Sequence, residues 1–167
     1  MFKKVSVYDL KYNVFEEFSR NWILLSAKNA EGKVNTMTIG WGSLGNIWGK
    51  EAATVYVRQT RYTKEFMDNE EYFTLSLFED NKKELGVLGA KSGRDGDKIS
   101  EVGFHVEYVE GQPAFKESKC VLVCRKMYVD DIAMEDMPKE EVDRWYADGN
   151  FHTMYIGEIV ACYVNEQ

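Results

Sequence analysis

Hydrophobic and polar residues alternate with a period of two along most of this chain, the pattern of β-strands with one buried face. Two such runs, 22–29 and 33–41, flank the turn signal Ala30-Glu31-Gly32, which predicts a hairpin. Further strands are predicted in runs of the same kind at 53–58, 72–78, 104–110, 113–117, 118–129 and 152–165.

A few short segments instead carry helical periodicity or helix-terminal signals. They are 12–20, where Val14, Phe15 and Phe18 would share one face, 62–70, a short stretch from Asn81, and a stretch from Pro138 to near Gly149. Segments 42–51 and 91–98 are rich in glycine and polar residues and are predicted as loops. Because strands outnumber helices and most are joined by short turns, the predicted class is mainly β (α+β), an antiparallel β-barrel with peripheral helices.

Length and charge narrow the class of protein. The 167 residues suit one domain, 1–167, which can bury roughly 70% of its unfolded surface. The net charge of −7 argues against nucleic acid and anionic membrane as partners. Basic and acidic residues are interleaved, as on a solvated face, at Lys82, Lys83, Glu84, Lys91, Arg94, Asp95, Asp97 and Lys98. The chain shows neither a basic-then-apolar leader nor an apolar run of ~20 residues, so a cytoplasmic location is expected.

The three cysteines predict neither a disulfide nor a metal site. Cys120 and Cys124 face the same side of a predicted strand but lie roughly 13 Å apart at ~3.3 Å per residue. With Cys162 they are expected to be buried, reduced thiols that pack as small apolar groups.

One basic turn stands out in this acidic chain. Residues 52–64 form a predicted strand followed by a helix start, with Arg58, Arg61 and Lys64, three threonines and no acid. Backbone N–H groups and the helix dipole would favour a phosphate there. Upstream, the strand 35–43 ends in small residues and glycines against which a flat ligand could lie. Together the two segments suggest a phosphorylated aromatic cofactor.

At these residues the chain resembles the flavin reductase family of FMN-binding split β-barrels, within it the flavoredoxin-like branch. The resemblance rests on NTMTIGWGS (35–43), VRQTRYTKEF (57–66), SGRDGDK (92–98) and HTMYIGEIV (152–160). It implies non-covalent FMN, a homodimer with the flavin near the subunit interface, and NADH or NADPH as electron donor. The chain has Gly149-Asn150-Phe151-His152 where many reductases have Gly-Asp-His.

The candidate site follows from both arguments. Arg58 is expected to hold the phosphate through its planar guanidinium, and Thr60, Thr63 and Lys64 would complete that site. Thr63 could instead cap the helix, and Arg61 and Lys64 could be solvated. The ring edge would meet Asn35, Thr36, Met37, Thr38 and Ser43. Trp48 and, after it, Trp41 are candidate stacking partners, although either could belong to the core. The resemblance places Asp97 and Lys98 at the entrance and His152 in the catalytic role, and His152 could equally be structural.

These residues give a first hypothesis and an alternative. The first is an FMN-binding oxidoreductase, an NAD(P)H-dependent flavin reductase in which two stacked rings exchange hydride without an acid–base residue. The alternative is a flavoredoxin-like electron carrier that takes electrons from a redox protein partner and has no nicotinamide site. A barrel that has lost flavin altogether is a third possibility.

Overall fold

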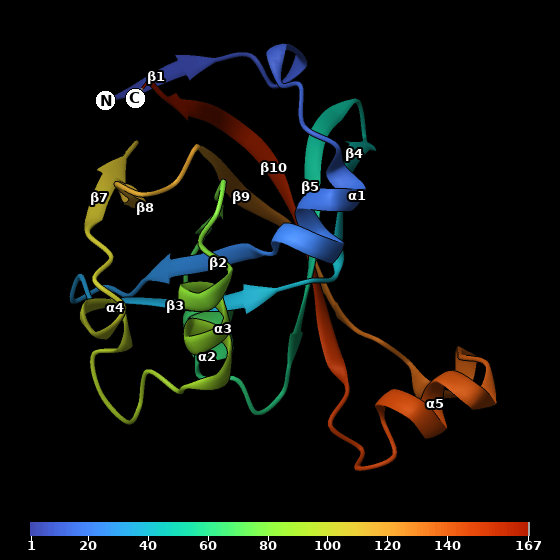
Figure 1. The fold of residues 1–167 in the computed structure, drawn as a ribbon. Helices are drawn as coiled ribbons and strands as arrows, with labels where there is room; N and C mark the ends of the chain where they lie inside the picture. Colours follow the sequence, from blue (N-terminus) through green and yellow to red (C-terminus); the bar gives the residue numbers. More distant parts are fainter. Residues whose placement is uncertain (167) are drawn as a thin grey trace.

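A computed structural model describes residues 1–166, so Gln167, the last residue of the predicted domain, lies outside the described part. Eight strands form one antiparallel sheet in the order β3-β2-β6-β9-β10-β5-β4, with β1 paired to β10 (Figure 1). The edge strands β3 and β4 follow each other in the chain, joined only by Gly40 and Trp41, so the sheet curls into a barrel whose edges meet without pairing. The strands are β1 (Phe2–Val5), β2 (Ile23–Lys28), β3 (Val34–Ile39), β4 (Gly42–Ile47), β5 (Lys50–Arg58), β6 (Tyr72–Leu77), β9 (Cys120–Asp131) and β10 (His152–Asn165), with a separate hairpin of β7 (Val106–Val109) and β8 (Gln112–Phe115).

Short helices lie around the barrel, and the predicted antiparallel barrel with peripheral helices is confirmed. They are η1 (Val7–Asp9), α1 (Val14–Glu16), η2 (Glu17–Asn21), α2 (Tyr62–Asn69), α3 (Lys82–Ala90), α4 (Lys98–Glu101), η3 (Met134–Asp136) and α5 (Lys139–Trp145). The segment with η3 and α5 projects from the barrel between β9 and β10 (Figure 1). Within residues 1–166 no helix has both the length and the apolar character that crossing a bilayer requires.

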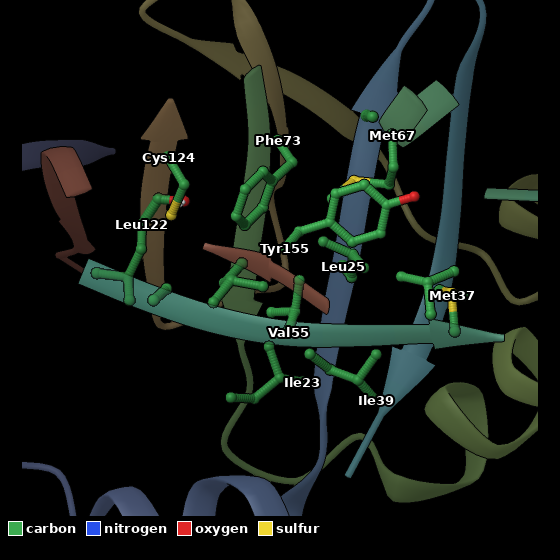
Figure 2. Packing of buried hydrophobic residues seen from close by; sticks show 14 of the residues in the cluster. Ile23, Leu25, Met37, Ile39, Val55, Met67, Phe73, Leu122, Cys124 and Tyr155 are labelled. Atoms are coloured by element: carbon green, nitrogen blue, oxygen red, sulfur yellow. Dashed lines mark hydrogen bonds between the residues drawn. The ribbon is translucent and has the colours of Figure 1, made fainter. Parts of the chain in front are cut away.

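The main core fills the inside of the barrel. Figure 2 shows Leu25, Val55, Phe73 and Tyr155 facing one another from β2, β5, β6 and β10, and all four are fully buried. A second apolar cluster, which includes Leu24, lies on the other side of β2 beneath α3. β2 is thus buried on both faces, which accounts for its nearly continuous apolar sequence.

β10 bends where it crosses this core. Its pairing with β9 shifts register between Ile156 and Gly157 and again between Ile159 and Ala161, as at β-bulges. The Phe73 ring packs so closely on Gly157 that a Cβ built there would lie 2.7 Å from a ring carbon. The glycine therefore lets a core ring lie against the strand.

The predicted loop at 42–51 is wrong. Residues Gly42–Ile47 form β4 and pair with β5, and Ile47 pairs with Lys50 across a tight turn at Trp48 and Gly49. Both turn residues have positive φ, as two-residue hairpin turns require. The glycines and polar residues misled the prediction, because backbone pairing on an edge strand does not need apolar side chains.

Two predicted helices differ from the structure in detail. Phe15 is 85% exposed, whereas Val14 and Phe18 face the core, so the three do not share one face. The helix there continues with wider π-type turns, which changes the angle between successive side chains. The helix predicted from Pro138 to Gly149 already ends at Trp145, and Pro138 is its N-cap.

All three cysteines are free and buried, as predicted. The Sγ atoms of Cys120 and Cys162 lie 3.9 Å apart on neighbouring strands, a proximity that sequence spacing does not reveal. Burial raises the pKa of the Cys124 thiol. Among residues 1–166, no three His, Cys, Asp or Glu side chains gather as a metal site.

Candidate functional site

The basic turn predicted from the sequence lines a cleft of about 190 Å³, here called the cationic cleft. The turn after β5 and the start of α2 form one wall, the segment from the end of α3 onward forms another, and β3 contributes Asn35. The lining residues are Asn35, Thr60, Arg61, Tyr62, Thr63, Ala90, Lys91, Ser92, Gly93 and Lys98.

Lys98 lies in the wall of the cationic cleft and is only 5% exposed, so its predicted place on a solvated face is wrong. Its Nζ donates hydrogen bonds to the carbonyl oxygens of Leu88 (2.7 Å) and Lys91 (2.8 Å) at the C-terminal end of α3. The last carbonyl groups of α3 lack partners within their own helix and need hydrogen-bond donors, which Lys98 of α4 supplies. The alternation of charges in the sequence could not show this contact between the two helices. Burial and the charge of Arg61 lower the pKa of Lys98 to about 8.

Arg61 is the second cation of this cleft and is half-buried. Its Nη1 donates to the carbonyl oxygen of Gly89 (2.8 Å), and burial lowers the pKa of the guanidinium. Among the described residues, neither Arg61 nor Lys98 forms an ion pair with a carboxylate. The C-terminal dipole of α3 offsets only part of two full charges. Placing the buried Lys98 beside the half-buried Arg61 is costly unless an anion joins them, so this cleft is suited to an anionic group.

The start of α2 adds backbone donors to the same cleft. Its N-cap residue, Arg61, makes no side-chain hydrogen bond to the first turn, and Tyr62 and Thr63 of that turn line the cleft. The buried Thr63 hydroxyl accepts a hydrogen bond from Asn35 Nδ2 (2.9 Å), so Thr63 joins α2 to β3 rather than capping the helix. A helix start without a capping side chain is a ready site for a phosphate.

A second cleft, of about 170 Å³, lies farther along β3 and is here called the tryptophan cleft. Trp41 packs edge-on against Trp145 with ring centroids 5.0 Å apart, and its centroid lies 5.1 Å from that of His152. Trp41 is 41% and Trp145 38% exposed, so aromatic surface remains open to a ligand. The lining residues are Met37, Thr38, Ile39, Gly40, Trp41, Tyr56, Arg58, Trp145 and His152.

Arg58 lines the tryptophan cleft and not the cationic cleft. Its guanidinium donates to the carbonyl oxygens of Asn150 (2.6 Å) and Trp145 (3.1 Å) and lies over the Tyr146 ring. These contacts tie the projecting α5 segment to the end of β5. These two hydrogen bonds use two of the five guanidinium N–H donors, and the phosphate contact expected of Arg58 stays a prediction.

His152 is the first residue of β10 and is buried in the wall of the tryptophan cleft. Its Nδ1 lies 2.8 Å from the Tyr146 hydroxyl oxygen. Burial and the nearby charge of Arg58 lower the pKa of His152 to about 4, so the imidazole is neutral at physiological pH. A neutral ring of this kind serves as a hydrogen-bonding group and not as a standing positive charge.

The remaining predicted residues separate into three groups. Asn35, Thr60 and Thr63 line the cationic cleft, and Met37 and Thr38 line the tryptophan cleft. The others line neither cleft. The Thr36 hydroxyl donates a hydrogen bond to the Leu25 carbonyl oxygen inside the sheet, and Ser43 and Trp48 are exposed. Lys64 forms an ion pair with Asp68 at 2.8 Å, and Asp97 caps α4.

The two clefts are linked by β3. Asn35 faces the cationic cleft, and Met37 to Trp41 line the tryptophan cleft. At ~3.3 Å per residue, Asn35 and Ile39 are roughly 13 Å apart along the strand. The arrangement suits one extended ligand with an anionic end and a flat aromatic end.

Comparison with known proteins identifies the family of the chain. The model of the family described as Flavin reductase like domain matches residues 15–167. The chain belongs to the flavin reductase-like family. No curated protein sequence matches this flavin reductase-like chain closely enough to add to the comparison.

Solved structures share the fold of this flavin reductase-like chain along nearly its whole length. A flavoredoxin from Methanosarcina acetivorans is 26% identical, with a TM-score of 0.67 over 99% of this chain and 76% of that one. A flavoredoxin of Desulfovibrio vulgaris (Miyazaki F) is 18% identical, with a TM-score of 0.69 over 98% and 78%. The styrene monooxygenase flavin reductase of Pseudomonas putida S12 is 17% identical, with a TM-score of 0.66 over 87% and 80%. One similar structure is described as a split barrel domain, so the predicted split-barrel class is confirmed.

Four residues of the two clefts were missed or given little weight at the level of sequence. Arg61 was left open as solvated, and Lys98 was assigned to a solvated face and, by resemblance, to the entrance. Trp41 was placed behind Trp48 as a stacking partner, and Trp145 was not proposed. An available signal was the position of Arg61 directly before a helix without a Ser, Thr, Asp or Asn cap. The sequence carried no comparable signal for Trp145, because only the fold brings α5 next to β3.

Proposed function

We propose that this chain binds FMN non-covalently and acts as an oxidoreductase, an NAD(P)H-dependent flavin reductase. The observation that carries the proposal is the pair of cations in the cationic cleft, the buried Lys98 and the half-buried Arg61, with an aromatic cleft farther along β3. The FMN phosphate would lie in the cationic cleft and the ring system in the tryptophan cleft. Membership of the flavin reductase-like family supports the same cofactor.

The residues of the cationic cleft fit a phosphate in number and type. Lys98 uses two donors on α3 carbonyls and Arg61 one, which leaves further N–H donors on both side chains. The α2 start supplies backbone N–H groups, and the Thr60 hydroxyl lies on the same wall. The phosphate would supply the charge that this pair of cations lacks among residues 1–166.

The tryptophan cleft would hold the ring and keep its outer side accessible. Bound FMN supplies the redox chemistry, since its ring accepts hydride and passes electrons on. The chain contributes position: Met37 and Thr38 from β3 form the floor, and His152 offers a neutral hydrogen-bonding ring. The exposed surface of Trp41 and Trp145 would guide a nicotinamide ring into a stacked position.

A specific observation favours a second candidate, a flavoredoxin-like electron carrier. The chain has Asn150-Phe151 before His152, and the Asn150 carbonyl is bound by Arg58 and its side chain by Thr60. The hydrogen-bonding groups of this segment therefore bind within the protein, next to α5. A nicotinamide ring would then lack hydrogen-bond partners here. The 26% identical relative is a flavoredoxin.

One measurement distinguishes the candidates. The protein is purified without added flavin, its visible spectrum is recorded, and NADH or NADPH is added without oxygen. A flavin spectrum that bleaches supports the reductase, and one that stays unchanged supports the carrier. A colourless protein that also fails to take up added FMN would contradict the proposed cofactor.

Cytoplasmic location and a homodimer with flavin near the subunit interface remain part of the proposal.

A further inference from the structure

A third cavity lies at another part of the barrel and shares no lining residue with either cleft of the proposed FMN site. It measures about 380 Å³, which is within the range of small-molecule sites. The segment from η1 to η2 covers it on one side, and barrel residues such as Ile23, Leu44 and Leu122 form the other. Most of its lining is aliphatic or aromatic, so it would take an apolar ligand.

One buried carboxylate interrupts this apolar lining. Glu17 is only 5% exposed and lines the cavity. Its Oε1 accepts a hydrogen bond from Lys119 Nζ (2.8 Å), whereas its Oε2 is buried without a hydrogen-bond partner among the described residues. A buried carboxylate oxygen without a donor is destabilising, and a ligand that brings a donor would relieve the cost.

The charge of the cavity indicates the sign of that ligand. Among its described lining residues, Glu17 and Glu51 are the acidic side chains, and no Lys, Arg or His is among them. Lys119 approaches Glu17 from outside the lining and is shared with Glu79, at 3.5 Å. The local balance is therefore negative, which disfavours anionic ligands and favours cations.

We infer that this cavity binds a small apolar amine, with its hydrocarbon part among the aliphatic side chains and its ammonium group donating to Glu17 Oε2. This site is independent of the proposed FMN site. Charge-assisted hydrogen bonds to a carboxylate are roughly twice as strong as neutral ones, so the positive charge of the ligand should dominate selectivity.

The test uses three probes of one shape: 2-phenylethylamine, 2-phenylethanol and phenylacetate, titrated calorimetrically into the full chain. The amine is expected to bind at least about tenfold more tightly than the alcohol, and phenylacetate to give no measurable binding. Glu17→Gln keeps the shape of the side chain and removes its charge, so it should abolish the preference for the amine. Leu44→Trp fills the cavity and should abolish binding of amine and alcohol alike.

Two controls keep the test decisive. Glu16→Gln removes the neighbouring exposed carboxylate, which pairs with Arg20, and should leave amine binding unchanged. Circular dichroism and thermal unfolding show that each variant is folded. Equal binding of the three probes, no binding of the amine, or an undiminished preference for the amine in Glu17→Gln would each overturn the inference.

Discussion

Arg58 Nη1 donates to the carbonyl oxygen of Asn150 over 2.6 Å, and this contact fixes the projecting α5 segment to the end of β5. A second donor of the same guanidinium reaches the carbonyl oxygen of Trp145. Trp145 is in turn packed edge-on against Trp41. A single arginine therefore positions one wall of the tryptophan cleft, although its side chain was expected to bind phosphate.

Arg58→Ala should weaken FMN and riboflavin by the same factor, roughly tenfold, because loss of the clamp frees Trp145 and not a phosphate ligand. Flavin fluorescence quenching measures both affinities. Lys139→Ala, an exposed change on α5, is the matched control and should have little effect. If Arg58→Ala weakened FMN alone and left riboflavin unchanged, Arg58 would bind the phosphate, as the sequence suggested.

Lys98→Met should give the opposite pattern. The substitution keeps the length of the buried side chain and removes its charge, so FMN affinity should fall about 10- to 100-fold while riboflavin binding is unchanged. Lys83→Met is the control, since Lys83 is exposed on α3 and lines neither cleft. Equal losses for FMN and riboflavin would place the phosphate elsewhere.

The lowered pKa of Lys98 predicts two pH effects of opposite sign. FMN affinity should fall as pH rises through about 8, by at most roughly tenfold per pH unit, because the lysine loses its charge. The stability of the flavin-free protein should instead rise between about pH 8 and 10.5, where the unfolded chain binds a proton that the folded chain does not. Both effects should be absent from Lys98→Met. An FMN affinity with the same pH dependence in both proteins would contradict this account.

The sequence was sufficient for the barrel because strand periodicity is a local property. It failed at β4, where Gly42, Ser43 and Gly45 pair through backbone groups that carry no side-chain signal. It also failed for Lys98, whose burial depends on the packing of α4 beneath the end of α3.

The cluster of cations around the start of α2 was predictable from the sequence, but the separate contacts of its two arginines were not. Arg58 and Arg61 are three residues apart and chemically identical. In the fold, Arg58 donates to the Asn150 carbonyl oxygen in the segment after α5, and Arg61 donates to the Gly89 carbonyl oxygen at the end of α3. That difference depends on segments that are distant in the sequence, and one sequence alone does not show which of them lie close together in the fold.

Gly157→Ala should destabilise the fold by about 1–3 kcal/mol, because the added methyl group meets the Phe73 ring in a filled core. Gly45→Ala on β4 is the matched control, since a Cβ there meets no atom within 4 Å. Its effect should stay within about 0.5 kcal/mol. Urea unfolding of both variants measures the difference, and equal stabilities would mean that Phe73 moves aside without cost.

His152 provides a test of whether a proton is exchanged at the ring site. Since burial and the charge of Arg58 lower its pKa to about 4, the ring stays neutral between about pH 5 and 8, and turnover should show no ionisation of His152 there. In the unfolded chain His152 binds a proton near pH 6.5, whereas in the folded chain it stays neutral down to about pH 4. The free energy of unfolding should therefore fall as pH drops from about 6.5 towards 4. His152→Asn should lose less stability over that interval, by about 2 kcal/mol, in urea unfolding at each pH. A turnover profile with an inflection near pH 6.5 that vanishes in His152→Asn would instead make this histidine a proton donor in the reaction.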